Sequence, residues 1–422
     1  MDTSVMITLG FLIFAIVMFA WEKIPLSITA MVVAVGLHLS GVLSAREAFA
    51  GFVDPNVLLF MGMFVIGEAF FATGVAVGVG NVVHKFAKTE TSLLVAVMMI
   101  TGILSGFLSN TGTAAVLIPV IIGICKKSGF KQTKLLMPLV FAAAMGGNIS
   151  LIGAPGNMIA QAGLQQAGLG SFNFFDYGLV GLPILIVGTI FYATIGKRFL
   201  PDAPSHQPDG AFEGNDDYSH VPSWKKWTAA IILILTVVAM IFEKQLGVKL
   251  YVSAWIGALV LVATNVISET AAVKSIDMKT IMLFAGSMAL GDAMVKTGTG
   301  SVIADIIVNS LGASPSPIVV LVVIFVLGVF MTNFMSNTAT CALLVPIGLS
   351  LASRLGFDPK AVLAAIVIAS SLAYATPIGM PANTMVYNIA GYSFMDYVKA
   401  GVPLIIVSSI VAFILLPILF PF

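Results

Sequence analysis

The chain has 422 residues, of which 59% are hydrophobic and 9% charged, and its formal net charge is +1. A soluble globular chain is about half apolar and about a quarter charged, so this composition predicts an all-α polytopic membrane protein. The near-zero net charge excludes a basic field for nucleic acid. Two cysteines and four histidines form no metal-ligand pattern and pair no nucleophile with a base, so we expect neither a membrane-embedded hydrolase nor an organic cofactor.

The first half of the chain reads as five spans and one re-entrant helical hairpin. A span needs about 20 apolar residues. Simple spans are predicted at 5–21, 24–41, 57–80 and 177–200. The apolar stretch 92–125 is interrupted by Ser109-Asn110-Thr111, which indicates a hairpin that enters and leaves on one side. The stretch 135–167 is interrupted by Gly153-Ala154-Pro155-Gly156-Asn157, which indicates one discontinuous helix.

The second half repeats these features in order. Ser336-Asn337-Thr338 matches the first Ser-Asn-Thr triplet, and Gly379-Met380-Pro381-Ala382-Asn383 matches the first glycine break. The series indicates a tandem duplication. We expect a first repeat at 1–200, a linker at 201–224 and a second repeat at 225–422, with its hairpin at 315–352 and its broken helix at 361–391. Five spans per half is an odd number, so the repeats should have inverted topology.

Loop charge predicts the orientation. Lysine and arginine gather on one side of the predicted spans, at positions that include Lys23, Lys126, Lys134 and Lys226. The positive-inside rule makes that side cytoplasmic. The linker 201–224 is then cytoplasmic, and both termini lie outside a plasma membrane of bacterial type.

Each interruption exposes polar groups at membrane depth, where they must be buried in protein or line a wet cavity. Carbonyl and hydroxyl oxygens suit a hard cation such as Na⁺, whereas the N–H ends of half-helices suit an anion. Small polar residues also permit close helix packing. This packing interpretation fits Ser105 or Thr332 considered alone, but the duplicated motifs favour a binding site.

Glu68 and Asp292 occupy matching positions near span centres. An acid inside the membrane suggests a proton relay or coupling site. Hydrogen bonding between helices, or contact with the membrane interface, is an equal alternative for this pair.

With these motifs, the chain resembles the divalent anion/Na⁺ symporter family of the ion transporter superfamily, which includes arsenite and citrate carriers. The resemblance covers residues from about Val5 to the C-terminus. It implies two sodium sites and a substrate site between them. The sodium ligands would be Ser105, Ser109, Asn110 and the Gly153 carbonyl in one half, and Thr332, the Met335 carbonyl, Asn337 and the Gly379 carbonyl in the other.

The family's substrate contacts would match Asn110, Thr111, Asn337 and Thr338. Ala154 and Met380 also fall in the substrate site, where dicarboxylate carriers of the family usually have hydroxyl residues, so the substrate's identity stays open. The resemblance further implies a homodimer with an elevator-type movement.

These observations predict a secondary active transporter that couples Na⁺ to a small anion, of di- or tricarboxylate type. The alternative is a proton-coupled or exchange carrier that uses Glu68 and Asp292 to move an inorganic oxyanion, arsenite or an organic acid. A channel is a further alternative, against which the inverted broken helices argue.

Overall fold

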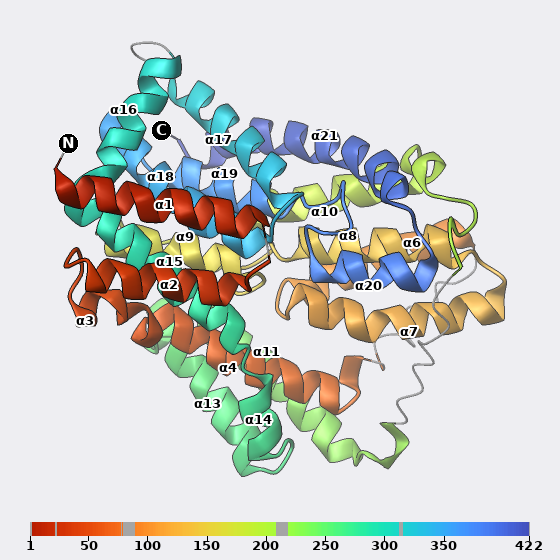
Figure 1. Ribbon diagram of the computed structural model, residues 1–422. Helices are drawn as coiled ribbons and strands as arrows, with labels where there is room; N and C mark the ends of the chain where they lie inside the picture. Colours follow the sequence, from red (N-terminus) through yellow and green to blue (C-terminus); the bar gives the residue numbers. More distant parts are fainter. Residues whose placement is uncertain are drawn as a thin grey trace.

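The computed structural model describes residues 2–21, 23–76, 78, 89–207, 218–311 and 315–421. Within these ranges the regular elements are helices (Figure 1). Six are long and apolar enough to cross a membrane, and shorter apolar helices accompany them. The prediction of an all-α polytopic membrane protein is confirmed.

The elements of the first half begin with a helical pair and continue in the predicted order. They are α1 (Thr3–Trp21), α2 (Leu26–Leu39), α3 (Ala45–Ala48), η1 (Ala50–Val53), α4 (Pro55–Ala72), α6 (Glu90–Ser105), α7 (Asn110–Ser128), η2 (Gln132–Lys134), α8 (Leu136–Gly146), α9 (Pro155–Gln166), α10 (Gly178–Ala193) and η3 (Gly196–Phe199).

The second half follows the linker, and its long helices come in a similar order. Its elements are η4 (Tyr218–His220), α11 (Ser223–Ile241), α12 (Glu243–Leu246), α13 (Leu250–Ala263), α14 (Glu269–Ser275), α15 (Met278–Thr297), α16 (Thr299–Leu311), α17 (Pro317–Thr332), α18 (Asn337–Leu355), α19 (Lys360–Ser370), α20 (Pro381–Ala390) and α21 (Phe394–Leu419).

Three elements differ from the hydropathy prediction. The span predicted at 177–200 ends at Ala193, where Thr194 leaves the helix. The third span ends at Ala72 rather than Gly80, because Thr73 leaves the helix and Gly74 has a φ of +75°; residues 79–88 lie outside the described part. Helix α16 was not predicted. It is amphipathic, with Ala304 and Val308 buried and Ile306 exposed, and at 13 residues it is too short to read as a span.

Helices of the first half pack directly against helices of the second half. Gly62 of α4 meets Ala254 of α13, where an added Cβ would lie 2.7 Å from the alanine Cβ. Gly286 of α15 meets Ala30 of α2 in the same way, also with 2.7 Å to the alanine Cβ. Small residues let membrane helices approach closely without polar contacts. Each half therefore completes the packing of the other.

The centre of the molecule is formed by α8 and α19, in which nearly every residue is buried. Aromatic side chains join the halves beside them: Phe141 and Tyr374 have ring centroids 5.2 Å apart. The Tyr192 hydroxyl donates to the Ala400 carbonyl at 2.9 Å, and the Tyr392 hydroxyl donates to the Thr133 carbonyl at 2.8 Å. These bonds satisfy polar groups that would be costly if left unpaired in the interior.

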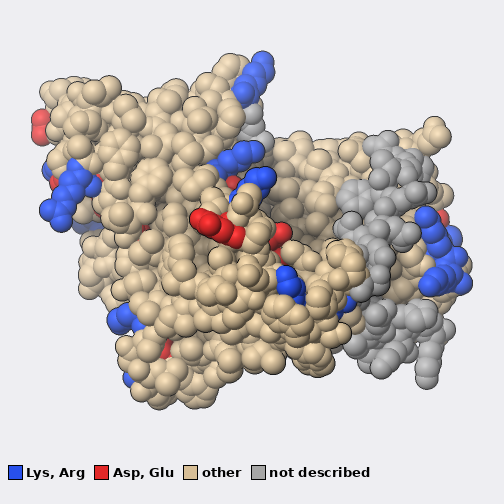
Figure 2. All heavy atoms as spheres, turned by 90° about the horizontal axis from the view of Figure 1, so that it is seen from below, with Lys and Arg blue, Asp and Glu red and all other residues tan. Residues whose placement is uncertain are grey.

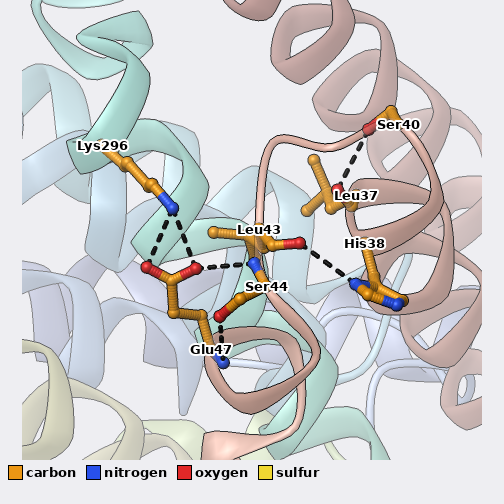
Figure 3. A network of polar contacts seen from close by, with 7 residues as sticks. All are labelled: Leu37, His38, Ser40, Leu43, Ser44, Glu47 and Lys296. Carbon is orange, nitrogen blue, oxygen red and sulfur yellow. Dashed lines mark hydrogen bonds and ion pairs between the residues drawn. The ribbon is translucent and has the colours of Figure 1, made fainter.

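A polar network fastens the α2–α3 corner to the end of α15 (Figure 3). Lys296 donates to both Glu47 carboxylate oxygens at 2.9 Å, and Ser44 and Glu47 form a capping box at the start of α3. The bonds from Lys296 and Ser44 lower the pKa of Glu47 to about 2. Helices α2 and α15 pack side by side, and the network joins their C-terminal ends. The N-terminal end of α15 therefore lies at the opposite end of this pair.

Charged side chains are sparse and scattered on the face shown in Figure 2, where most atoms belong to other residues. The described part of the linker lies against the helices around it. Asp202 contacts Lys131 at 2.9 Å and Lys134 at 2.8 Å, and Ser205 donates to Asp396 at 2.7 Å.

Candidate ion and anion site

The Ser-Asn-Thr motifs begin two helices at matching turns. Ser109 caps α7 by accepting from the Gly112 N–H at 3.0 Å, and Ser336 caps α18 by accepting from the Ala339 N–H at 3.1 Å. A serine cap satisfies one of the free N–H groups at a helix start. It also places the next residue, Asn110 or Asn337, at the first helical position beside the preceding helix.

Four oxygen-bearing groups come together at the start of α7, and one of them is the side-chain amide of Asn110. The Ser105 hydroxyl lies 2.7 Å from the Asn110 Oδ1 and 2.7 Å from the Ala143 carbonyl oxygen. The same amide atom of Asn110 lies 3.2 Å from the carbonyl oxygens of Gly153 and Ala143. We call these four groups the first oxygen cluster.

The second half builds the same arrangement around Asn337. The Thr332 hydroxyl contacts the Asn337 Oδ1 at 2.9 Å and also donates to the Ser370 carbonyl. The inward amide atom of Asn337 lies 3.1 Å from the Gly379 carbonyl oxygen and 3.1 Å from that of Ser370. These groups form the second oxygen cluster.

The inward atom of each asparagine amide faces only carbonyl oxygens and a hydroxyl, so the surrounding hydrogen bonds assign nitrogen to this position. With nitrogen inward, Asn110 donates to Ser105 and to the two carbonyls, and Asn337 does the same in its cluster. With oxygen inward, each cluster presents only oxygens, which is the ligand type that a hard cation binds. The oxygen groups in each cluster are therefore of the type that a hard cation binds.

The chain breaks hold the carbonyls in place by a repeated bonding pattern. Asn157 donates to the carbonyls of Gly147 and Ser150, both at 2.8 Å, and Asn383 donates to those of Ala373 at 2.7 Å and Thr376 at 3.1 Å. Each asparagine thus bridges the ends of its interrupted helix, which frees the Gly153 and Gly379 carbonyls for the clusters.

Position 153, in the first break, requires glycine because other backbone segments approach it closely. A Cβ on Gly153 would lie 2.5 Å from the Gly147 carbonyl oxygen and 3.0 Å from that of Gly106. Both neighbours are backbone atoms, which cannot move aside as a flexible side chain can.

A cavity of about 560 Å³ borders both clusters. Most of the predicted substrate and ion residues line it, which places parts of the chain more than 200 positions apart around one space. From the predicted set these are Ser109, Asn110, Thr111, Gly153, Ala154, Asn337, Thr338, Gly379 and Met380.

The remaining predicted residues lie elsewhere. Ser105 and Thr332 are fully buried behind the asparagines, and Met335 is buried in the turn before α18. Glu68 and Asp292 are half-buried on α4 and α15 and are not among the residues that line the cavity. The structure does not bring these acids together with the oxygen clusters.

Sequence reasoning missed two kinds of site group. The Ala143 and Ser370 carbonyls have no signal of their own, although each lies 38 residues after its hydroxyl partner in both halves. Lys279, at the start of α15, lines the cavity although it is remote from every motif. Asp277 also lines it, with oxygens engaged by the Lys279 N–H at 3.1 Å and the Thr280 hydroxyl at 2.5 Å.

Known proteins similar to the chain are transporters. It is 24% identical to the transporter YfbS of Escherichia coli, with all of both chains covered, and 28% identical to a transporter of Haemophilus influenzae, with 96% and 89% covered. It is 24% identical to the sodium-dependent dicarboxylate transporter SdcS of Staphylococcus saprophyticus, with 94% and 84% covered.

Solved structures share the fold. The YdaH transporter of Alcanivorax borkumensis has a TM-score of 0.67 at 16% identity, covering 98% of this chain and 99% of that one. MtrF of Neisseria gonorrhoeae has a TM-score of 0.62 at 14% identity, covering 99% and 95%.

A family model described as citrate transporter matches residues 16–342 and, again, residues 237–421. The relatives are transporters rather than enzymes, and the predicted membership of the ion transporter superfamily is confirmed. The chain belongs to the citrate transporter family.

Proposed function

We propose that this protein is a secondary active transporter that couples Na⁺ to the movement of a small anion of the di- or tricarboxylate class. The observation that carries the proposal is the pair of matching oxygen clusters that border one cavity. A channel needs no such pair, whereas a carrier built from two repeats places its ion and substrate sites where the repeats meet.

Sodium would be bound by the side-chain oxygens of Ser105 and Asn110 with the Ala143 and Gly153 carbonyls, and by the corresponding groups around Asn337. Ser109 and the Met335 carbonyl remain further candidate ligands from the family resemblance. The cation is cargo in this scheme, and its binding rotates the amide to its oxygen-inward orientation. Relatives named sodium-dependent dicarboxylate transporters support this choice of ion.

The anion would bind between the clusters, against Asn110, Thr111, Asn337 and Thr338, with Ala154 and Met380 shaping the space. The cavity volume of about 560 Å³ falls in the usual range for small-molecule sites, about 300–1,000 Å³. Among the described lining residues Lys279 is the one cationic side chain. Bound Na⁺ would therefore supply most of the positive charge that the anion meets.

Alternating access would follow from the repeat. We propose that the α6–α7 and α17–α18 pairs are re-entrant hairpins of two inverted repeats, and that the units move as an elevator. The repeated element order supports the duplication, and loop charge supports external termini with a cytoplasmic linker at 201–224. The homodimer is proposed from the family resemblance.

A proton-coupled or exchange carrier is the second candidate. Its supporting observation is that Glu68 and Asp292 occupy matching places in the C-terminal parts of α4 and α15, and that both are half-buried. Uptake driven by a pH gradient in Na⁺-free buffer, and lost in Glu68→Gln, would favour this function over the first.

The test is the thermal stability of the detergent-purified protein in Na⁺ against choline, with citrate, succinate and arsenite titrated in each. A ligand that binds only the folded state stabilises it by RT ln(1 + [L]/Kd), about 2.7 kcal/mol at a hundredfold excess over Kd. We expect a Na⁺-dependent rise in melting temperature that one of the carboxylates enlarges. Equal melting temperatures in Na⁺ and choline would contradict Na⁺ coupling.

A further inference from the structure

The described helices can be divided into two groups that share a long, packed boundary. The hydrophobic cluster of α1, α2 and α15 includes Met335, Ala339 and Leu343 from across it, and α16 lies against α18. We call the first group the scaffold unit; its described residues are 2–21, 23–76, 78 and 218–311, with α1 to α4 and α11 to α16. The core unit contains residues 89–207 and 315–421, with both helical pairs and both chain breaks. In Figure 1 the scaffold helices α4, α11, α13 and α14 follow the lower edge, and the core helices α10 and α21 lie above.

The cavity lies between these units and reaches one end of the boundary. Its lining includes Pro25, Leu26 and Ser27 at the start of α2, and Ser275, Asp277, Lys279 and Thr280 between the end of α14 and the first turn of α15. We call these two segments the mouth. The other end of α15 carries Lys296 and its network with Glu47 (Figure 3). The mouth and this network therefore mark opposite faces of the molecule.

Besides this apolar packing, three described hydrogen bonds or ion pairs between side chains join the scaffold unit to the core unit. The Asn56 amide donates to the Gln165 Oε1 at 3.1 Å, Lys244 donates to the Asn173 Oδ1 at 3.2 Å, and Arg354 pairs with Asp305. We call these the latch contacts. Asn56 is buried and is also bonded to the Asp54 carboxylate at 2.9 Å, so its amide is held toward Gln165.

All three latch contacts lie on the face opposite the mouth. Gln165 and Arg354 are close to the ends of α9 and α18, helices that begin at the cavity and run away from it. On the scaffold side, Asn56 begins α4 directly after the corner held by the Glu47 network, and Asp305 lies in α16, which directly follows α15. At the other face the described ion pairs stay within one unit, as between Asp202 and Lys131.

We propose that the latch contacts hold this transporter closed on one face while the cavity is open at the mouth, and that they must break for the cavity to open on the other face. This inference rests on the proposed transport function. Positive-inside charge assigns the mouth to the cytoplasm, because Lys23 and Lys279 lie there. The described conformation is then the inward-open one.

The strength of the latch contacts suits a switch between two conformations. An exposed ion pair changes an equilibrium by up to about fivefold, and a neutral hydrogen bond by about two- to tenfold. Three such contacts can bias a two-state equilibrium strongly without preventing the transition. Larger or fully buried ion pairs would hold one state too firmly for a cycle.

The test measures access to the mouth and needs no substrate. Thr280→Cys is labelled with a membrane-impermeant maleimide in vesicles, in a background with Cys125→Ala and Cys341→Ser. Breaking the latch with Asn56→Ala, Lys244→Gln and Arg354→Gln should lower the labelling rate by at least about threefold, as the population moves away from the open mouth. Arg354→Gln alone changes an exposed residue, and a smaller fall is expected.

Glu47→Gln is the matched control, because it breaks an ion pair on the same face but within the scaffold unit. It should leave labelling unchanged. An unchanged rate in the latch variants, or an equal fall in the control, would overturn the proposal.

A second experiment separates the latch from the identity of the substrate. A disulfide between Asn56→Cys and Gln165→Cys should keep Thr280→Cys open to labelling and stop Na⁺-driven uptake of citrate or succinate until a reductant is added. The control disulfide, between Glu47→Cys and Lys296→Cys, should stop neither. If labelling responds to the latch but neither acid is taken up, the latch stands and the proposed substrate class fails. Undiminished uptake through the crosslinked protein would exclude the latch.

Discussion

At the scale of single residues, Asn110 and Asn337 are distinguished by the chemistry of their surroundings. Each amide faces a hydroxyl and two carbonyl oxygens at 2.7–3.2 Å. An amide that packs in an ordinary helix interface would need one or two partners, whereas here every neighbour of the inward atom is an acceptor or a hydroxyl. Such a position suits a donated N–H group, and with the amide reversed it suits a cation, so under the proposed function it would link protein stability to Na⁺.

Asn110→Ala and Asn337→Ala should each remove the stabilisation by Na⁺ while costing about 1–3 kcal/mol of folding free energy. The cost arises because Ser105 or Thr332 and the carbonyls lose a buried partner. Melting temperature in Na⁺ against choline checks both effects. Ser350→Ala on α18 is the control, since its hydroxyl bonds only within its own helix, to Pro346 at 2.9 Å. A wild-type Na⁺ response in both asparagine variants would remove these residues from the ion sites.

Lys279→Gln should weaken the response to the anion by about two- to fivefold in Kd and leave the response to Na⁺ unchanged. The lysine is exposed at the mouth, so its attraction for an anion is screened and should grow as ionic strength falls. The measurement is an anion titration of melting temperature in Na⁺ at low and high ionic strength. Lys274→Gln, on α14 and outside the lining, should behave as the wild type; a shared loss would indicate a general surface effect.

At the scale of elements, the chain breaks depend on backbone segments that pack directly against one another and leave no room for a side chain between them. α8 and α9 are divided at residues 147–154, and α19 and α20 at 371–380. The same asparagine bridge closes both gaps. The breaks are therefore specific structures with their own bonds rather than flexible interruptions.

Gly153→Ala should lower stability by about 1–3 kcal/mol and weaken the Na⁺ response, because the new Cβ would press against the Gly147 and Gly106 carbonyl oxygens. Gly123→Ala is the matched control. It lies within α7 with nothing inside 4 Å of an added Cβ, so the change should stabilise by about 0.5–1 kcal/mol through lower chain entropy. Thermal unfolding with and without Na⁺ distinguishes the two variants, and equal effects would contradict the packing argument.

At the scale of the whole molecule, the halves cannot be packed separately. α4 lies against α13 through Gly62 and Ala254, and α15 lies against α2 through Gly286 and Ala30. Phe60 and Phe284 also meet, with ring centroids 6.0 Å apart. A half on its own would leave two such surfaces without a partner.

Two chains divided between residues 207 and 218 should therefore assemble when they are co-expressed and should restore the Na⁺-dependent shift in melting temperature. Either half alone should aggregate in detergent, because its α4 or α15 lacks the helix that it packs against. Affinity capture of one half, with size-exclusion chromatography of the product, measures this. A single half that is monodisperse and unfolds cooperatively would contradict the interlocked arrangement.

The sequence by itself determined the membrane class, the positions of the chain breaks and the polar side chains at the helical turns. These follow from local properties: hydropathy over about 20 residues, serine before a helix start, and glycine with proline at a break. The duplicated motifs also predicted that both halves supply residues to one site, and the cavity lining includes residues from both motifs and both breaks.

Only the tertiary structure decided which backbone carbonyls face the asparagines, that Lys279 reaches the cavity, and that Glu68 and Asp292 stand apart from it. A carbonyl belongs to every residue, so nothing in the sequence singles out Ala143 or Ser370. The packing of helices from one half against helices from the other could not be predicted either. An apolar pattern shows that a helix is buried, but it does not show which other apolar helix it packs against. Partner choice depends on the shape of paired surfaces, such as Gly62 on Ala254, and that shape exists only in the folded molecule.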